Sequence, residues 1–223
     1  MNKTILMMKN VSNLNEHERI DLIHSVKVSK KVLNYLEDKL QNLSIEILGD
    51  YKGNIIELMK RGLLEGWCWQ TTESTVVFLE DDDYIERGNL KFGNYKEYWH
   101  SWICFNFENK KFVFDPCLQI LVESSIYYHI FEVSVKGTAT AKQVRDDLIY
   151  RINNSKKKSY DESPENFFEK FFAPYLSESQ KTETYISGNN DVNSPMYRNN
   201  TGYNATIENG KIKNLIAHYY LGG

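Results

Sequence analysis

Three residues that together can activate a sulfur nucleophile occur in order along the chain: Cys68, His100 and Asp115. A cysteine attacks a carbonyl carbon as its thiolate, an imidazole can take and return the proton, and a carboxylate can hold the imidazole in the required tautomer. A chain of 223 residues with 3 Cys and 5 His also contains such triples by chance. Whether these three act together therefore depends on the local sequence around each of them.

Cys68 stands at the start of a segment typical of a helix, CWQTTESTVVFL at 68–79. Gly66 lies just ahead of it and allows a sharp backbone turn into the first helical residue. Unpaired backbone N–H groups and the helix dipole at a helix N-terminus favour a thiolate over a thiol. The sequence thus predicts an activated position for Cys68.

His100 and Asp115 lie in two segments rich in aromatic and β-branched residues, HSWICFNF at 100–107 and FVFD at 112–115. The polar residues 108–111 between these segments predict a β-hairpin. Alternate residues of a strand point to opposite faces. We therefore expect His100, Trp102 and Cys104 on one face and Ser101, Ile103 and Phe105 on the other.

The register of this hairpin decides whether His100 can reach Asp115. A turn centred on Glu108 and Asn109 sets Trp102 opposite Asp115, which makes Asp115 a diagonal neighbour of His100 on the same face. A turn centred one residue later moves the two apart. The first register permits a hydrogen bond between the imidazole and the carboxylate.

As a unit, these motifs resemble the core of the transglutaminase-like superfamily of papain-fold thiol enzymes. The matching residues are GWC at 66–68, HSW at 100–102 and FDP at 114–116. The resemblance implies an α+β fold with a papain-like core, a helix opened by the cysteine and an antiparallel sheet carrying the histidine and the aspartate. It also implies the roles: Cys68 as nucleophile, His100 as general base and acid, and Asp115 as the residue that orients His100.

The segment RGLLEGWCWQ at 61–70 resembles, more weakly, the Gly-Gly-x-Cys stretch of the arylamine N-acetyltransferases. The paired glycines are absent here, and the chain is shorter than those enzymes usually are. Trp102 after the histidine and Pro116 after the aspartate favour the transglutaminase-like family.

The 4 tryptophans of the chain bracket Cys68 and His100 in sequence, and aromatic side chains suit the walls of a substrate cleft. We assign Trp67, Trp69 and Trp102 to substrate binding, with at least one of the first two facing the cleft and Trp102 packing beside His100. The backbone N–H of Cys68 is the expected first donor of an oxyanion hole. Gln70 is the candidate for a side-chain donor.

The other two cysteines are interpreted as packed, unreactive thiols. Cys104 lies in the middle of a strand, where no helix dipole activates it, and Cys117 follows the Asp-Pro turn. A disulfide between them is disfavoured in a reducing compartment. The remaining histidines are scattered, and no cysteine pair has the spacing of metal ligands, so we expect neither a metal nor a cofactor.

Composition indicates one cytoplasmic domain. With 41% hydrophobic and 13% aromatic residues the chain can bury a core. A net charge of -3 does not suggest a nucleic-acid partner. The apolar patch near the N-terminus is interrupted by Lys9 and Asn10, so we expect neither a signal peptide nor a membrane span.

The chain divides into three parts of this single domain. Residues 1–64 predict a helical lead-in, residues 65–135 the catalytic helix and antiparallel sheet, and residues 136–223 further helices and a hairpin. The hairpin is expected to turn at Asn209 and Gly210. Residues 156–165 suggest a polar linker, 165–176 an aromatic helix and 187–202 a loop.

Two classes of function remain open. The first is an acyl-transfer enzyme acting through a thioester, with a peptide or protein substrate and with water or an amine as acceptor, or an acetyltransferase of the second family. The second is a binding module that keeps the fold and holds a peptide or protein in an aromatic groove. The acceptor, the oligomeric state and any role of the terminal Gly222 and Gly223 are left open by the sequence.

Overall fold

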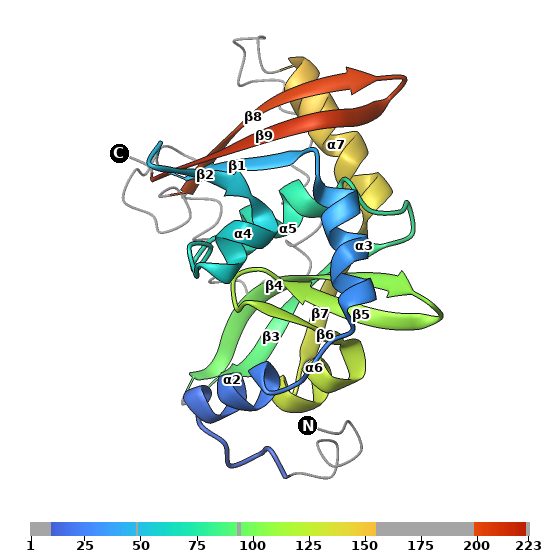
Figure 1. Ribbon diagram of the computed structural model, residues 1–223. Helices are drawn as coiled ribbons and strands as arrows, with labels where there is room; N and C mark the ends of the chain where they lie inside the picture. Colours follow the sequence, from blue (N-terminus) through green and yellow to red (C-terminus); the bar gives the residue numbers. More distant parts are fainter. Residues whose placement is uncertain (1–9, 48, 93–94, 155–198, 222–223) are drawn as a thin grey trace.

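The computed structural model of the chain describes residues 10–47, 49–92, 95–154 and 199–221 (Figure 1). Its fold is of the α+β class, with two separate sheets. The helices are α2 (Glu16–His24), α3 (Lys30–Leu40), α4 (Ile55–Lys60), α5 (Cys68–Val76), α6 (Ser124–Phe131) and α7 (Ala141–Asn154). The strands are β1 (Leu43–Ile47), β2 (Tyr51–Asn54), β3 (Tyr84–Phe92), β4 (Tyr95–Phe107), β5 (Lys110–Asp115), β6 (Ile120–Glu123), β7 (Ser134–Thr140), β8 (Asn199–Glu208) and β9 (Lys211–Leu221).

The five-stranded sheet carries His100 and Asp115 and has the order β6-β5-β4-β3-β7, with every neighbouring pair antiparallel. Strands β4 and β5 pair Phe107 with Lys110 and Ile103 with Phe114. The turn between them is Glu108-Asn109, with φ of 46° and 62°, the backbone of a tight two-residue hairpin. The register expected from a turn at these two residues is therefore confirmed.

The four-stranded sheet has the order β2-β1-β9-β8, in which β1 runs parallel to β9 and the other pairs are antiparallel. Its hairpin β8–β9 turns at Asn209 and Gly210, both at positive φ, as the sequence predicts. Strands β1 and β2 correct the expectation that residues 1–64 are helical. Leu43, Ile45 and Ile47 alternate with less buried residues, and this two-residue period is what places the segment in a sheet.

Four layers are visible in Figure 1: the four-stranded sheet, the helices α3, α4 and α5, the five-stranded sheet, and the helices α2 and α6. The core between the two sheets includes Leu36 of α3, Val76 of α5, Ile103 of β4 and Leu215 of β9. A second core lies between the other face of the five-stranded sheet and helices α2 and α6. Helix α5, which begins at Cys68, is thus enclosed between two sheets.

The expected alternation along β4 is confirmed by these two cores. Ile103 and Phe105 belong to the core that α5 covers, whereas Trp102 and Cys104 belong to the core that α6 covers. Helix α3 lies within the lead-in that the sequence predicts as helical, α5 ends three residues earlier than the segment 68–79, and the described C-terminal part adds β7 ahead of α7. The linker, the aromatic helix and residues 187–198 of the expected loop lie outside the described residues, as do Gly222 and Gly223. Residues 199–202, expected in the same loop, instead form the start of strand β8.

Gly88 of β3 pairs with His100 of β4 on one side and with Val135 of β7 on the other. Because glycine has no side chain, β3 and β7 can approach each other closely at this position. A Cβ atom at Gly88 would lie 2.2 Å from the carbonyl oxygen of Ser134 and 2.9 Å from Cα of Val135. Both neighbours are backbone atoms, and the pairing of β3 with β7 shifts by one residue at this point. A side chain here would have to force the strands apart.

We expect Gly88→Ala to lower the free energy of unfolding by about 2–3 kcal/mol, because the added methyl group overpacks a strand pair that cannot move aside. Urea unfolding followed by far-UV circular dichroism measures the change. Gly53→Ala is the matched control in β2: its Cβ would meet side-chain atoms of Glu57 and Leu58 at 3.3 and 3.5 Å, and we expect it to cost less than about 1 kcal/mol. Equal effects of the two substitutions would contradict the close approach at Gly88.

Candidate active site

Helix α5 begins at Cys68, as the sequence predicts. Gly66 has a φ of +82°, a left-handed conformation that favours glycine and turns the chain into the helix. Trp67 is the N-cap residue and makes no side-chain capping hydrogen bond. The first-turn N–H groups therefore receive no acceptor from the capping side chain, and the positive end of the helix dipole lies at the half-buried Cys68.

His100 and Asp115 form a buried pair. Nε2 of His100 lies 2.8 Å from Oδ2 of Asp115, and the two side chains are 1% and 0% exposed. The hydroxyl of Tyr127 donates to the same oxygen at 2.8 Å, and the backbone N–H of Leu118 donates to Oδ1 at 3.2 Å. The carboxylate is thus held by three donors, so the orientation of the imidazole is fixed.

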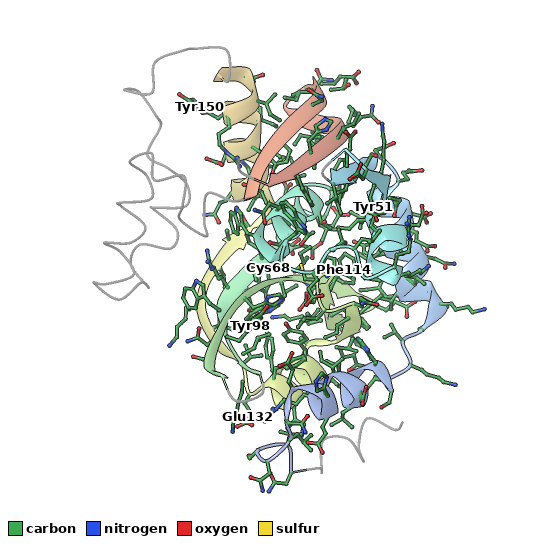
Figure 2. All side chains as sticks on the ribbon, turned by 90° about the vertical axis from the view of Figure 1, so that its left-hand side faces the viewer. Tyr51, Cys68, Tyr98, Phe114, Glu132 and Tyr150 are labelled. Atoms are coloured by element: carbon green, nitrogen blue, oxygen red, sulfur yellow. The ribbon has the colours of Figure 1, made fainter. Side chains whose placement is uncertain are left out.

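The imidazole of His100 presents its other nitrogen, Nδ1, to Cys68. The ring is packed between Tyr98 and Trp102, with centroid distances of 5.6 and 6.4 Å. Since Nε2 is bonded to Asp115, Nδ1 is the nitrogen left to act on Cys68; it is buried, makes no direct hydrogen bond to a described residue, and influences the thiol mainly through the charge of the ring. Figure 2 labels Cys68, the first residue of α5, and Tyr98 of β4, which belong to the two elements that pack together at this site.

Cys68 reaches the edge of β4 because β5 ends early. In the hairpin, β5 pairs with residues 103–107 of β4 and ends at Asp115. His100 and Ser101 of β4 therefore have no partner strand on the side where β5 lies. Helix α5 packs against β4. Both His100 and Ser101 favour the thiolate form of Cys68, although these two side chains leave the strand on opposite faces.

The charges around the site favour a thiolate and an imidazolium. Burial opposes ionisation of Cys68, but the neighbouring His100 and its charge, with smaller effects of Ser101 and Arg87, outweigh it and lower the pKa of the thiol to about 7. Burial alone would lower the pKa of His100, whereas Asp115 and the Cys68 thiolate raise it to about 10. The two groups titrate as a pair, and the pair is mainly zwitterionic between the pKa of the thiol, about 7, and that of the imidazole, about 10.

Two residues at the site, Ser101 and Arg87, were not predicted from the sequence. Ser101 was assigned correctly to the face opposite His100, but its contact with Cys68 depends on the open edge of β4. Arg87 is the partner of Ser101 in β3, and the thiolate and the guanidinium each favour the charged form of the other. Neither position can be predicted from local sequence, since that of Ser101 depends on where β5 stops pairing with β4 and that of Arg87 on the pairing of β3 with β4.

The predicted aromatic cleft is only partly supported. Trp102 is fully buried, and its Nε1–H donates to Glu86 at 2.7 Å, so it lies in the core beside His100 and forms no cleft wall. Trp67 is 7% exposed and stacks on Tyr219 at 5.1 Å, which also places it in the core. Trp69 is half-buried and remains the candidate for the cleft, and Gln70 is buried at 8% exposure in the first turn of α5.

Cys104 and Cys117 are free, buried thiols, as expected for packed residues. Burial and the neighbouring Glu86 raise the pKa of Cys104. Burial also raises the pKa of Cys117, and the negative charges of Cys68 and Asp115 act in the same direction. Cys68 is therefore the cysteine whose environment favours the thiolate.

Within the part of the chain that the structure describes, no group of three His, Cys, Asp or Glu side chains is placed to hold a metal ion. None of the described helices combines the length and the apolar character needed to cross a membrane. Comparisons with protein-family models, curated proteins and solved structures gave no match. The function is therefore inferred from the geometry of the chain itself.

We expect iodoacetamide to modify Cys68 with a pH midpoint near 7 and to leave Cys104 and Cys117 unmodified in the folded protein, because burial protects them and raises their pKa. His100→Ala removes the cation that lowers the pKa of Cys68, so the midpoint should rise and the rate at pH 6.5 should fall by about tenfold or more. Mass spectrometry of digested samples measures each cysteine separately. His17→Ala, on the exposed surface of α2, is the control and should not change the profile.

Proposed function

We propose that the protein is a cysteine-dependent acyl-transfer enzyme of the transglutaminase-like kind. The observation that carries this proposal is the buried hydrogen bond between Nε2 of His100 and Asp115, which leaves Nδ1 facing a cysteine at a helix N-terminus. An ion-paired thiolate, a base of fixed orientation and a carboxylate that stabilises the imidazolium are the parts that nucleophilic catalysis by cysteine requires.

The proposed reaction has two steps. The thiolate of Cys68 attacks the carbonyl carbon of an amide or ester, and the electron pair of the C=O bond moves to oxygen. As this tetrahedral intermediate collapses, the bond to the leaving group breaks and the imidazolium of His100 gives its proton to that group. Water or an amine then attacks the thioester, His100 takes a proton from it, and the C–S bond breaks to restore the thiolate.

The oxyanion of the tetrahedral intermediate requires donors beside Cys68. The backbone N–H of Cys68 suits this role, because it opens a helix whose N-cap side chain makes no capping bond. Gln70 lies in the same first turn but is 8% exposed, so its amide is the less accessible donor. We therefore assign the oxyanion site to the backbone of the first turn of α5.

The arrangement of elements supports the same family. A helix that begins with the nucleophile packs on an antiparallel sheet, and neighbouring strands of that sheet carry the base and its carboxylate, as in the papain-like core implied by the GWC, HSW and FDP motifs. We infer a peptide or protein substrate and a cytoplasmic location. Three free thiols suit a reducing compartment.

We expect p-nitrophenyl acetate to acetylate Cys68 in a burst that equals the enzyme concentration, followed by slower turnover. Intact-protein mass spectrometry should show one added acetyl group, and peptide mapping should locate it on Cys68. Cys68→Ala should abolish the burst, whereas Cys104→Ala should retain it. Addition of hydroxylamine as a nucleophilic acceptor should speed turnover if the thioester is open to amines. Unacetylated wild-type protein would instead favour a binding module of the same fold.

We expect Asp115→Asn to reduce turnover by roughly 10³–10⁴-fold, because an amide cannot stabilise the imidazolium and holds the wrong tautomer of His100. Since Asp115 raises the pKa of His100, the pH at which the second proton of the Cys68-His100 pair leaves should fall in this variant. Steady-state rates and the pH profile of alkylation measure the two effects.

Asp83→Asn is the matched control for this loss of a buried carboxylate. Asp83 is 1% exposed and accepts backbone N–H bonds from Glu80 and Asn106, away from the site. We expect it to lower stability without lowering the rate per folded molecule. Equal loss of activity in both variants would mean that Asp115 acts on folding alone.

A further inference from the structure

Cys117 lies against the first turn of the helix that Cys68 opens. Its sulfur is 3.4 Å from the hydroxyl oxygen of Thr71, and both atoms are buried. The same hydroxyl donates to the backbone carbonyl oxygen of Trp67 at 2.8 Å and lies 3.2 Å from that of Cys68. A single hydroxyl group thus contacts the sulfur of one cysteine and the backbone of the other.

The turn after β5 brings Cys117 to the site from the side of the sheet. Asp115, whose carboxylate lies 2.8 Å from the imidazole of His100, precedes Cys117 by two residues. The backbone N–H of Leu118 donates to the same carboxylate at 3.2 Å, so the turn folds back onto Asp115. Cys117 is therefore fixed between α5 and the pair of His100 and Asp115.

The two sulfurs differ in protonation and in access to solvent. Cys68 is half-buried, and against the effect of burial the neighbouring His100 lowers the pKa of its thiol to about 7. Cys117 is only 7% exposed, and burial, followed by the negative charges of Cys68 and Asp115, raises the pKa of its thiol. Peroxides oxidise thiolates that they can reach, so Cys68 reacts first and Cys117 is present as a protonated thiol beside it.

We propose that Cys117 is a resolving thiol for Cys68: after a peroxide oxidises the nucleophile, the two cysteines form a disulfide that blocks the site reversibly. This inference rests on the activated thiolate of the proposed function and concerns the regulation of that same site. The disulfide protects Cys68 from further oxidation to sulfinic acid, which thiols do not reverse.

The proposed modification consumes one hydrogen peroxide and releases two waters. The thiolate of Cys68 attacks one peroxide oxygen, the O–O bond breaks, and the leaving hydroxide takes a proton from solvent. The sulfur of Cys117 then attacks the sulfenic acid, the S–O bond breaks, and the hydroxyl leaves as water with the proton of the Cys117 thiol. Each sulfur supplies one of the two electrons that reduce the peroxide. A dithiol such as dithiothreitol reverses the disulfide by exchange.

The surroundings of Cys117 allow this second step. A disulfide needs sulfurs about 2 Å apart, so the side chain of Cys117 must turn from Thr71 toward Cys68. Thr71 keeps its hydrogen bond to the carbonyl oxygen of Trp67 when the sulfur leaves. Conversion of the thiolate to an uncharged sulfenic acid also removes one of the charges that oppose ionisation of Cys117. Cys117 thus becomes a better nucleophile once Cys68 is oxidised.

Oxidation of the wild-type protein with one equivalent of hydrogen peroxide tests the proposal directly. The reaction is run at about pH 8, above the pKa of the Cys68 thiol, and remaining thiols are blocked with N-ethylmaleimide in denaturant. Mass spectrometry of a non-reduced digest should show a linked pair of peptides that contain Cys68 and Cys117. Cys104, in the core covered by α6 and 3.4 Å from the carboxylate of Glu86, should carry the blocking group. Dithiothreitol should restore the reactivity of Cys68 toward iodoacetamide.

Cys117→Ser removes the resolving sulfur and keeps a polar group beside Thr71. We expect peroxide to consume the Cys68 thiolate at an unchanged rate, because Cys117 does not set its pKa, and dimedone to trap the sulfenic acid. With excess peroxide, sulfinic acid at Cys68 should rise by about tenfold over wild type, and dithiothreitol should not restore reactivity. Cys104→Ser is the matched control and should form the disulfide as the wild type does.

The results separate this proposal from the proposed function. If wild-type Cys68 passes directly to sulfinic acid, or links to Cys68 of a second molecule, Cys117 is not a resolving thiol although Cys68 remains an activated nucleophile. Equal recovery of wild type and Cys117→Ser after reduction also contradicts the proposal. If Cys68 reacts with peroxide no faster than Cys104, the acyl-transfer function fails as well. The wild-type digest decides the question by itself if Cys117→Ser does not fold.

Discussion

The buried carboxylate of Asp115 is the constraint on which the site depends. Transfer of an ionised carboxylate into a protein interior is unfavourable unless donors replace the lost water. Three donors from different parts of the chain do so here: His100 of β4, Tyr127 of α6 and the backbone N–H of Leu118. Because Tyr127 is itself fully buried in the core between α6 and the sheet, the orientation of His100 depends on the packing of that layer. The packing of α6 and the orientation of His100 are therefore coupled.

The second requirement is an open strand edge. His100 and Ser101 point to opposite faces of the sheet, and in a fully paired strand a single thiol could not meet both. Strand β5 ends at Asp115, so the stretch of β4 that faces α5 has no strand beside it. Cys68 lies at the end of α5, which packs against β4, and both His100 and Ser101 favour its thiolate form. His100 leaves β4 on one face of the sheet, and Ser101 with its β3 partner Arg87 leaves on the other.

The sequence predicts the parts of the site that follow from local periodicity. Alternation along β4, the start of α5 after Gly66 and the turn at Glu108 and Asn109 all involve neighbouring residues, and all are found in the structure. Pairing between distant segments is not encoded locally. The role of Arg87 requires the register of β3 against β4, and strand β1 requires its parallel partner β9, more than 150 residues later in the chain. A five-residue alternation between two helices was too short to indicate a strand by itself.

The burial of Trp102 explains what a tryptophan contributes two residues after the histidine. Side chains two apart on a strand share a face, so the indole stacks beside the imidazole, with centroids 6.4 Å apart. Its Nε1–H is satisfied by Glu86, the residue opposite it in β3, and the hydroxyl of Tyr128 donates to the same carboxylate oxygen. A smaller apolar residue would leave a cavity beside His100 and a buried carboxylate with one donor fewer. The tryptophan thus fixes the orientation of His100 from within the core.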